Sequence, residues 1–186
     1  SGRLTEAAGP GVAAVAPPAW AAAVRRGMAG WQPRLERGTA RTVIEEALPG
    51  RTTVHDDPIE GADRNGLKAL PIVLGSHRPI DLLIVNLGTN DLKARFSVTP
   101  EDVAASVGVL VRFARASPAG PEARAPKILV VAPPVVAEAG FLAGPFKGAA
   151  EKSAHFGRCY AAVAARFGTA FLDAAPLVAS DPLDGI

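Results

Sequence analysis

A group of small polar residues follows an apolar run near the middle of the chain. Residues 80–87 are mostly apolar, and Gly88, Thr89, Asn90 and Asp91 come directly after them. An apolar run of this length predicts a buried strand. In open α/β sheets, ligands bind beyond the carboxyl ends of the strands. The sequence therefore predicts a polar site at the end of this strand.

The chemistry that these residue types favour is the binding of negative charge. The side-chain amide of Asn90 offers two N–H donors. Gly50 has no side chain, so a ligand oxygen could approach its backbone N–H closely. Two donors aimed at one point form an oxyanion hole, typically the largest catalytic contribution in acyl transfer. We expect Asp91 to hydrogen-bond loop backbone and hold Asn90 in place. Taken alone, however, an Asn-Asp pair after a strand, or a glycine such as Gly50, is also typical of an ordinary turn.

Strands and helices must position these residues. Four apolar runs predict strands, at residues 41–45, 80–88, 127–132 and 169–173. Three segments predict helices, at residues 65–77, 99–114 and 147–167, the first of them broken or started late by Pro71. Strands that alternate with helices, each strand a continuous apolar run, indicate a parallel sheet covered on both faces. The expected fold is α/β with three layers.

The helix predicted after residue 98 has the clearest start. A hydroxyl at the N-cap, proline at the first helical position and acids in the first turn are all favoured there, and the residues are Thr99, Pro100, Glu101 and Asp102. Apolar residues then recur at helical spacing and predict a buried stripe, made of Val103, Val107, Leu110, Val111 and Ala114.

Length and composition limit the function classes. A chain of 186 residues fits one domain with a sizeable core. Its 20 basic residues are scattered, so we expect no nucleic-acid partner despite a pI near 9.0. No apolar run approaches the roughly 20 residues that span a bilayer, so we expect no membrane partner. The single Cys159 excludes an internal disulfide and a zinc cluster and fits a reducing compartment, so the expected location is cytoplasmic.

The first 40 residues differ from the rest, because Ala, Gly, Pro and Arg fill most of them. They could form a short strand at 12–16 and an Ala-rich helix at 19–37, which Pro33 would interrupt or end. We therefore predict an atypical N-terminal segment, residues 1–40, followed by an α/β domain, residues 41–186.

Four segments, in order along residues 42–186, carry a resemblance to a known family. They are residues 43–53 with Asp56-Asp57-Pro58 after them, Leu87-Gly88-Thr89-Asn90-Asp91-Leu92-Lys93, residues 129–134, and residues 171–174 with Asp184-Gly185-Ile186. They resemble blocks of the SGNH (GDSL-type) hydrolase superfamily, close to its bacterial arylesterase/acyltransferase branch. The resemblance implies a flavodoxin-like parallel sheet and a serine ester hydrolase acting on small acyl esters, with acyl transfer to alcohols as a related activity. It also implies that no cofactor or metal is needed, that the partner is a small-molecule ester, and that the chain forms a homo-oligomer as relatives on this branch do.

The resemblance assigns roles to individual residues. The family's oxyanion donors are a backbone N–H of its second block and the Asn of its third, which match Gly50 and Asn90. Its catalytic Asp lies three residues before the catalytic His, and the match is Asp184, which would orient and stabilise the imidazole. Gly88, Asp91 and Arg51 are expected to support the site.

Two parts of the family's machinery have no match in this sequence. The nucleophile motif Gly-Asp-Ser does not occur, and the position three residues after Asp184 would follow Ile186. Ser1, at the start of Ser1-Gly2-Arg3-Leu4-Thr5, is the one candidate nucleophile of this type, but no strand precedes it to hold its hydroxyl. We therefore expect an incomplete and weakly active esterase whose first strand is not recognisable. The alternative is a non-catalytic α/β binding module that keeps the oxyanion pocket.

The three histidines offer no better triad base. His55 follows the second block and is more typical of a surface or substrate-contact residue. His77 ends a predicted helix and should lie far from the strand ends, and His155 on the long helix is expected to face solvent or a partner. A nucleotide-binding domain is disfavoured, because neither Gly-x-Gly-x-x-Gly nor Gly-x-x-x-x-Gly-Lys occurs.

Overall fold

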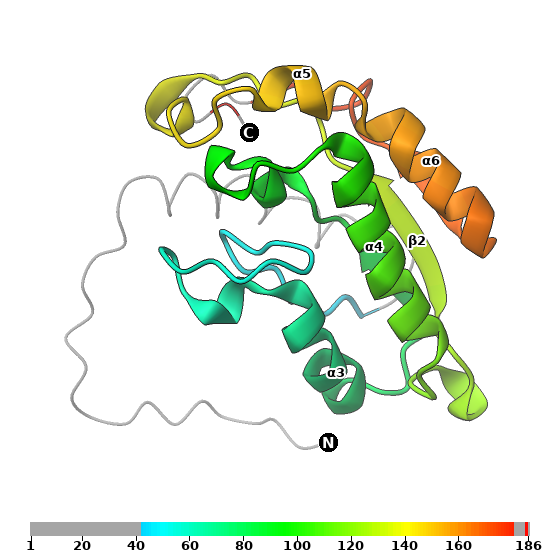
Figure 1. Ribbon diagram of the computed structural model, residues 1–186. Helices are drawn as coiled ribbons and strands as arrows, with labels where there is room; N and C mark the ends of the chain where they lie inside the picture. Colours follow the sequence, from blue (N-terminus) through cyan, green and yellow to red (C-terminus); the bar gives the residue numbers. More distant parts are fainter. Residues whose placement is uncertain (1–41, 181–184, 186) are drawn as a thin grey trace, which may run out of the picture. The chain divides into compact units, whose positions relative to one another are not determined.

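The structure is a computed structural model that describes residues 42–180 and residue 185. The chain divides into two compact units, residues 1–45 and 46–186, and every helix and strand given below belongs to the second (Figure 1). The strand predicted at 12–16 and the helix predicted at 19–37 lie outside the described residues, as do Ser1 and Asp184.

Three parallel strands form the sheet that carries the site. They are β1 (Leu82–Val85), β2 (Lys127–Ala132) and β3 (Ala170–Asp173), in the order β1-β2-β3. In register, Val85 lies beside Val130, which in turn lies beside Phe171. Because all three strands are parallel, their carboxyl ends meet at one edge of the sheet. The predicted α/β fold with a parallel sheet is confirmed.

Three longer helices form a layer against this sheet. Helix α3 (Gly66–Ser76) packs on α4 (Pro100–Arg115), and α4 packs on α6 (Phe156–Phe167), which also lies against β2 and β3 (Figure 1). Right-handed crossovers from β1 to β2 and from β2 to β3 place α4 and α6 on the same face. The described residues thus show one of the two helical layers expected. In this described part, no helix has the length and apolar character needed to cross a membrane.

Short helical elements complete the described chain. They are the helix α5 (Ala149–Ser153) and the 3-10 turns η1 (Ala62–Arg64), η2 (Thr89–Leu92), η3 (Ala94–Phe96), η4 (Pro121–Ala123) and η5 (Gly140–Leu142). Two of them, η2 and η3, lie between β1 and α4, and η2 carries the predicted site residues Asn90 and Asp91.

Helix α4 supplies the centre of the core, as its sequence predicts. Thr99 is the N-cap, and it forms a capping box in which its hydroxyl accepts the Asp102 N–H while Asp102 accepts the Thr99 N–H. The whole predicted stripe is buried, and it meets buried residues of β2 and α6 in one cluster that includes Ile128, Val130, Ala132, Phe156 and Tyr160.

Three predicted elements differ from the structure. Residues 42–48 form no strand, since a short apolar run becomes a strand only where a partner strand pairs with it. The single helix predicted at 147–167 is two helices, α5 and α6, separated at Ala154 and His155. Pro71 lies inside α3 and does not end it, because proline removes one backbone hydrogen bond while the rest of the helix, capped by Asn65, stays intact.

Candidate active site

The loop after β1 is shaped by a glycine that packs against a buried tyrosine. Gly88 has a φ of 130°, a conformation that side-chain-bearing residues rarely adopt, and it leads into η2, which carries Asn90. A Cβ at Gly88 would collide with the hydroxyl of Tyr160. That hydroxyl is buried and donates to the Leu87 carbonyl at 2.7 Å. The position of the Asn90 loop is therefore fixed by α6.

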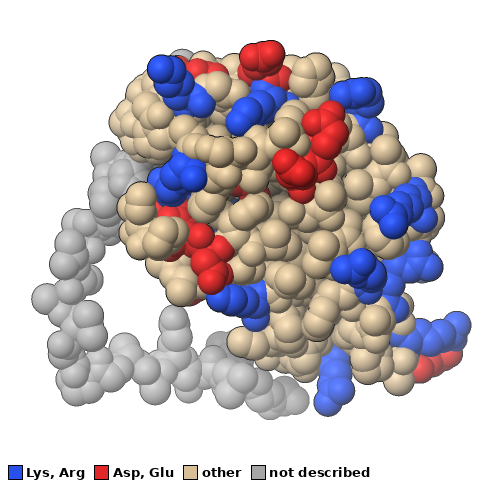
Figure 2. All heavy atoms as spheres, in the orientation of Figure 1, with Lys and Arg blue, Asp and Glu red and all other residues tan. Residues whose placement is uncertain are grey.

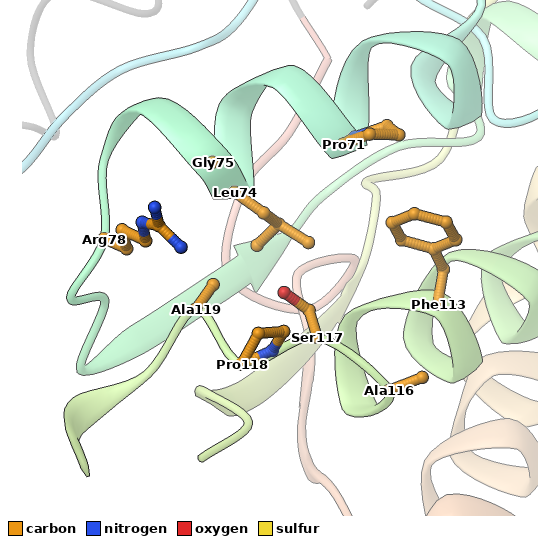
Figure 3. A pocket seen from close by; sticks show the side chains of 9 residues that line it. All are labelled: Pro71, Leu74, Gly75, Arg78, Phe113, Ala116, Ser117, Pro118 and Ala119. Atoms are coloured by element: carbon orange, nitrogen blue, oxygen red, sulfur yellow. The ribbon is translucent and has the colours of Figure 1, made fainter. Parts of the chain in front are cut away.

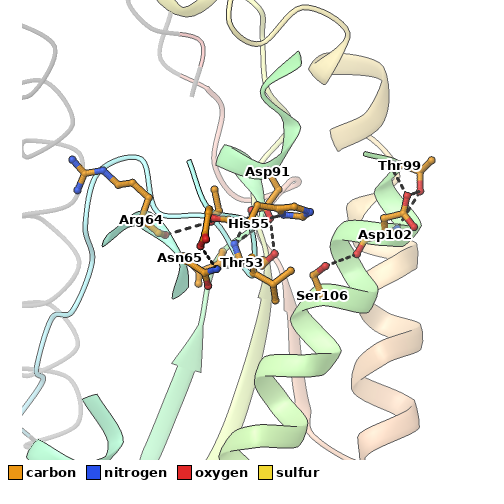
Figure 4. A network of polar contacts seen from close by, with 12 residues as sticks. Thr53, His55, Arg64, Asn65, Asp91, Thr99, Asp102 and Ser106 are labelled. Carbon is orange, nitrogen blue, oxygen red and sulfur yellow. Dashed lines mark hydrogen bonds and ion pairs between the residues drawn. The ribbon is translucent and has the colours of Figure 1, made fainter. Parts of the chain in front are cut away.

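The carboxylate of Asp91 joins this loop to the segment that follows Gly50. It is fully buried and accepts the Thr53 backbone N–H at 3.0 and 3.1 Å and the Thr53 hydroxyl at 2.5 Å. The Nδ1 atom of His55 lies 2.9 Å from the same carboxylate (Figure 4). Burial raises the pKa of Asp91, and the hydrogen bonds from Thr53 and His55 oppose that rise. Asp91 thus binds loop backbone, and the loop is that of the second block.

Gly50 lies in a tight turn of that second-block segment. Its φ is +85°, and the turn is closed by the Arg51 N–H, which donates to the Leu48 carbonyl at 3.0 Å. A side chain at position 50 would meet the Glu60 carboxylate. Arg51 donates to the Glu46 carbonyl at 2.9 Å, and burial lowers the pKa of its guanidinium. Arg51 therefore braces the start of the loop, and glycine is required at its turn.

The two proposed oxyanion donors have no hydrogen-bond partner in the part of the chain that the structure describes. Within the described residues, neither the Gly50 N–H nor the Asn90 side-chain amide is hydrogen-bonded to another protein group. Both residues are half-buried, and the bonds between Thr53 and Asp91 hold their loops together. Preorganised N–H donors of this kind can stabilise negative charge that develops on a carbonyl oxygen.

A second, ionic connection joins the same two loops. Lys93 Nζ lies 2.6 Å from Glu60 and 3.5 Å from Asp57. Arg95 lies 2.5 Å from Asp57 and 2.8 Å from Glu60. The side chains of Asp57 and Lys93 are 0% and 3% exposed. Burial opposes ionisation of Asp57, but hydrogen bonds from Arg95 and from the backbone N–H groups of Glu60 and Ile59 lower its pKa to about 2. The loops are therefore held by charge as well as by the Asp91 bonds.

A pocket of about 340 Å³ lies at the opposite edge of the sheet, where the strands begin. It is lined by the end of α3, the end of α4 and the loop that follows α4 (Figure 3), with Pro71, Leu74, Gly75, Arg78, Phe113, Ala116, Ser117, Pro118 and Ala119 as its walls. None of the predicted site residues is among them, so this pocket is separate from the oxyanion site.

Figure 2 shows basic side chains spread over this face, more of them toward the lower right, and acidic side chains mainly in its upper and left parts. In the described part of the chain, no three His, Cys, Asp or Glu side chains are grouped as ligands of a metal ion.

Sequence reasoning singled out Gly50, Asn90 and Asp91 but missed their supports. Tyr160 is the one tyrosine of the chain, and its place in the apolar stripe of a predicted helix was the available signal for a buried hydroxyl. Thr53 carried no signal, because a threonine after a turn is common on any surface. The ionic network had none either, since its two acids and its two bases lie 33 to 38 residues apart in the sequence.

The histidines are distributed as follows. The sequence predicts a surface or substrate-contact role for His55, and its side chain is 28% exposed and lies 2.9 Å from Asp91. His77 follows α3 and pairs with Glu46 at 2.6 Å, and His155 lies at the start of α6.

Comparisons with known proteins identify the family of this chain. Residues 4–185 match the model of the GDSL-like lipase/acylhydrolase family. No curated protein sequence matches the chain. Among solved structures, Est24, a carbohydrate acetylesterase from Sinorhizobium meliloti, is 40% identical, with a TM-score of 0.75 over 83% of this chain and 72% of that one.

Two further structures are similar. The native aryl esterase of M. smegmatis is 40% identical, with a TM-score of 0.78 over 84% of this chain and 75% of that one. A putative arylesterase from Agrobacterium tumefaciens is 34% identical, with a TM-score of 0.74 over 84% of this chain and 76% of that one. The predicted resemblance is confirmed, and the chain belongs to the GDSL-like lipase/acylhydrolase family of ester hydrolases.

Proposed function

We propose that this chain hydrolyses small acyl esters by a serine-type mechanism in which Asn90 and Gly50 are the oxyanion donors. Family membership supports ester hydrolysis, and the similar structures are described as aryl esterases and carbohydrate acetylesterases. The observation that carries the assignment is that neither N–H donor has a hydrogen-bond partner among the described residues, while Asp91 ties their loops together.

In the proposed reaction, a nucleophilic oxygen attacks the ester carbonyl carbon. The carbonyl π electrons move onto its oxygen, which then accepts hydrogen bonds from the Asn90 amide and the Gly50 N–H. Collapse of the tetrahedral intermediate expels the alcohol and leaves an acyl group on the nucleophile, which water removes in a second round. Asp184 holds the family's position for the residue that orients the catalytic histidine.

The proposal extends to acyl transfer, oligomeric state and cellular location. An alcohol that replaces water in the second round would make the chain an acyltransferase, as on the family branch that it resembles. That branch also supports a homo-oligomer, which light scattering after size-exclusion chromatography would measure. The lone Cys159 fits a reducing compartment and so a cytoplasmic location.

The test is hydrolysis of p-nitrophenyl acetate by the wild-type protein and by Asn90→Ala, each in a form extended by the family's nucleophile motif and by a histidine three residues after Asp184, for which this sequence has no match. We expect kcat to fall on the order of 10² to 10³-fold in the variant, the usual cost of losing one oxyanion donor, while KM changes little. Asn86→Ala is the matched control, because it removes the same amide from an exposed position that also follows β1. It should retain wild-type kcat.

Equal turnover by wild type and Asn90→Ala would contradict the oxyanion assignment. A chain that acetate stabilises against heat but that turns over no ester would instead be the non-catalytic binding module.

A further inference from the structure

The pocket where the strands begin has an apolar floor and one aromatic end. Leu74 and Ala119 are each 2% exposed and lie among the residues that line it. The ring of Phe113, which is 39% exposed, stands at one end (Figure 3). Concave sites of about 300–1,000 Å³ with mostly apolar walls are typical of small-molecule binding. Transfer of an apolar group from water into this pocket is therefore favourable.

Arg78 supplies a charge at the other end of the pocket. It follows α3, and Figure 3 shows its guanidinium directed toward Leu74 from the side opposite Phe113. Among the described residues, Arg78 has neither a hydrogen-bond partner nor an ion-pair partner. An arginine is always charged and presents several N–H donors in one plane, a geometry that fits a carboxylate. The free guanidinium indicates that an anionic group binds at this end.

Ser117 adds a neutral donor between the two ends. Its backbone N–H donates to the Ala114 carbonyl at 3.1 Å and closes the end of α4. Its hydroxyl points into the pocket (Figure 3) and has no hydrogen-bond partner in the part of the chain that the structure describes. Apolar walls combined with a few polar groups that fix orientation are the composition of a site for an amphipathic ligand.

The helix ends at this pocket must be weighed against an anionic ligand. Helices α3 and α4 both end here, and the last carbonyls of a helix carry partial negative charge, which favours cations. In α4 this charge is offset by Arg112 and Arg115 in the last turn. Helix α3 has no basic residue in its last turn, and Arg78 donates to none of its carbonyls. A cationic ligand would lie beside the Arg78 charge and be repelled by it, so an anion is favoured.

We propose that this pocket binds an apolar monocarboxylate, with its carboxylate on Arg78 and its hydrocarbon chain over Leu74 toward Phe113. The Ser117 hydroxyl supplies a further donor. The family hydrolyses esters, and ester hydrolysis releases a carboxylic acid, so the family's own reaction produces ligands of this class. The site is separate from Asn90 and does not depend on the oxyanion assignment.

Gly75 offers a way to fill the pocket without disturbing the fold. It lines the pocket, and a Cβ at this position would have no atom within 4 Å. It lies within α3, where leucine is favoured over glycine by helix propensity. Gly75→Leu should therefore occupy the space of the ligand chain. Its melting temperature without ligand should equal or exceed that of wild type.

The test is a titration of the wild-type chain with sodium octanoate, followed by NMR. We expect saturable shifts at Leu74, Ser117 and Ala119, with a Kd of about 1 mM, as for a ligand of this size. Arg78→Gln should weaken binding by about tenfold, because it removes a hydrogen-bonded charge pair, and Gly75→Leu should abolish it. Arg124→Gln is the matched control, since the Arg124 side chain is 73% exposed and does not line the pocket. It should bind octanoate as wild type does.

Three analogues separate the charge of the ligand from its chain. 1-Octanol keeps the chain without the charge and should bind about tenfold more weakly than octanoate. Octylamine reverses the charge, acetate lacks the chain, and neither should shift the pocket resonances. Octylamine that binds as tightly as octanoate would show that the helix ends, rather than Arg78, determine the ligand, and would overturn the proposal.

Other outcomes decide the site itself. The proposal fails if octanoate does not bind the wild-type chain, or if Arg78→Gln and wild type bind it equally. It also fails if Asn90→Ala loses octanoate binding, since the ligand would then lie at the oxyanion site. Pocket shifts that follow protein concentration without ligand would show that a second copy of the chain fills the pocket instead. Octanoate binding without ester turnover by the extended protein would defeat the proposed function and leave this site in place.

Discussion

The hydroxyl of Tyr160 occupies the space that a side chain at position 88 would need. This hydroxyl also donates to the carbonyl of Leu87, the preceding residue. The turn that presents Asn90 is thus held from outside by a residue of α6 and from within by the backbone conformation of Gly88.

Gly88→Ala is expected to destabilise the protein by about 2–4 kcal/mol, because it combines a strained positive φ with a steric clash in the core. Urea unfolding would measure this. Gly144→Ala is the control, as nothing lies within 4 Å of a Cβ there, and its stability should change by less than about 0.5 kcal/mol. Similar losses in both variants would contradict the proposed packing.

Tyr160→Phe should partly rescue Gly88→Ala. Alone, the Phe variant loses the bond to the buried Leu87 carbonyl and about 1–2 kcal/mol of stability. In the double variant the Tyr160 hydroxyl is absent and no longer clashes with the new methyl group. The double variant should therefore lose about 1 kcal/mol less unfolding free energy than the sum of the two single losses. A double-mutant cycle on unfolding free energies measures this coupling, and strict additivity would argue against the contact.

Thr53→Val and Thr53→Ser separate the hydroxyl of Thr53 from its shape. The Val variant removes one donor from the buried Asp91 carboxylate and should cost about 1–3 kcal/mol of unfolding free energy. It should also lower kcat, because the two donor loops lose part of their connection. The Ser variant keeps the donor and should stay near wild type in both measurements. Equal behaviour of Val and Ser would show that the hydroxyl is not what joins the loops.

Asp57→Asn should lower the unfolding free energy by about 3 kcal/mol, since it removes one anion from a buried ion network that includes Lys93. Asp56→Asn is the matched control. The Asp56 side chain is 54% exposed and pairs with Lys68 at the surface, so its replacement should change the unfolding free energy far less than Asp57→Asn does.

The same pair of variants predicts a pH effect. The pKa of Asp57 falls from 3.8 to about 2 on folding. Its stabilisation is therefore present above about pH 4 and is lost as the pH falls toward 2. Acid unfolding of Asp57→Asn should be less steep than that of wild type between these values. An unchanged slope would show that Asp57 does not titrate with folding.

Local sequence signals were sufficient where they agreed with one another. The bounds of strand β2 could be predicted without error from the sequence, because a continuous apolar run ends in two prolines. Helix α4 could be placed because cap, proline and apolar stripe coincide. The break between α5 and α6 could not be predicted from the sequence. There the Ser153 hydroxyl, at the end of α5, accepts the N–H of Val136, a tertiary contact that no local pattern encodes.

The site shows the same division. Gly50 and Asn90 could be singled out by residue type and position at the ends of elements. The hydrogen bonds that connect their loops could not be predicted, because Thr53 and Asp91 are 38 residues apart and no pattern in either segment indicates that the two pair. His55 and Tyr160 reach the site through bonds of the same kind, which only the folded chain brings together.

Because the contacts that fix the Asn90 loop span 36 to 73 residues of chain, the loop cannot take its final form from its own sequence. Closing long chain segments costs entropy before the contacts between them form. In refolding from urea, the helical circular dichroism signal should therefore recover before ester turnover does. Activity would then report on completion of the tertiary structure, and a chain could appear folded by its helices while still lacking a working site.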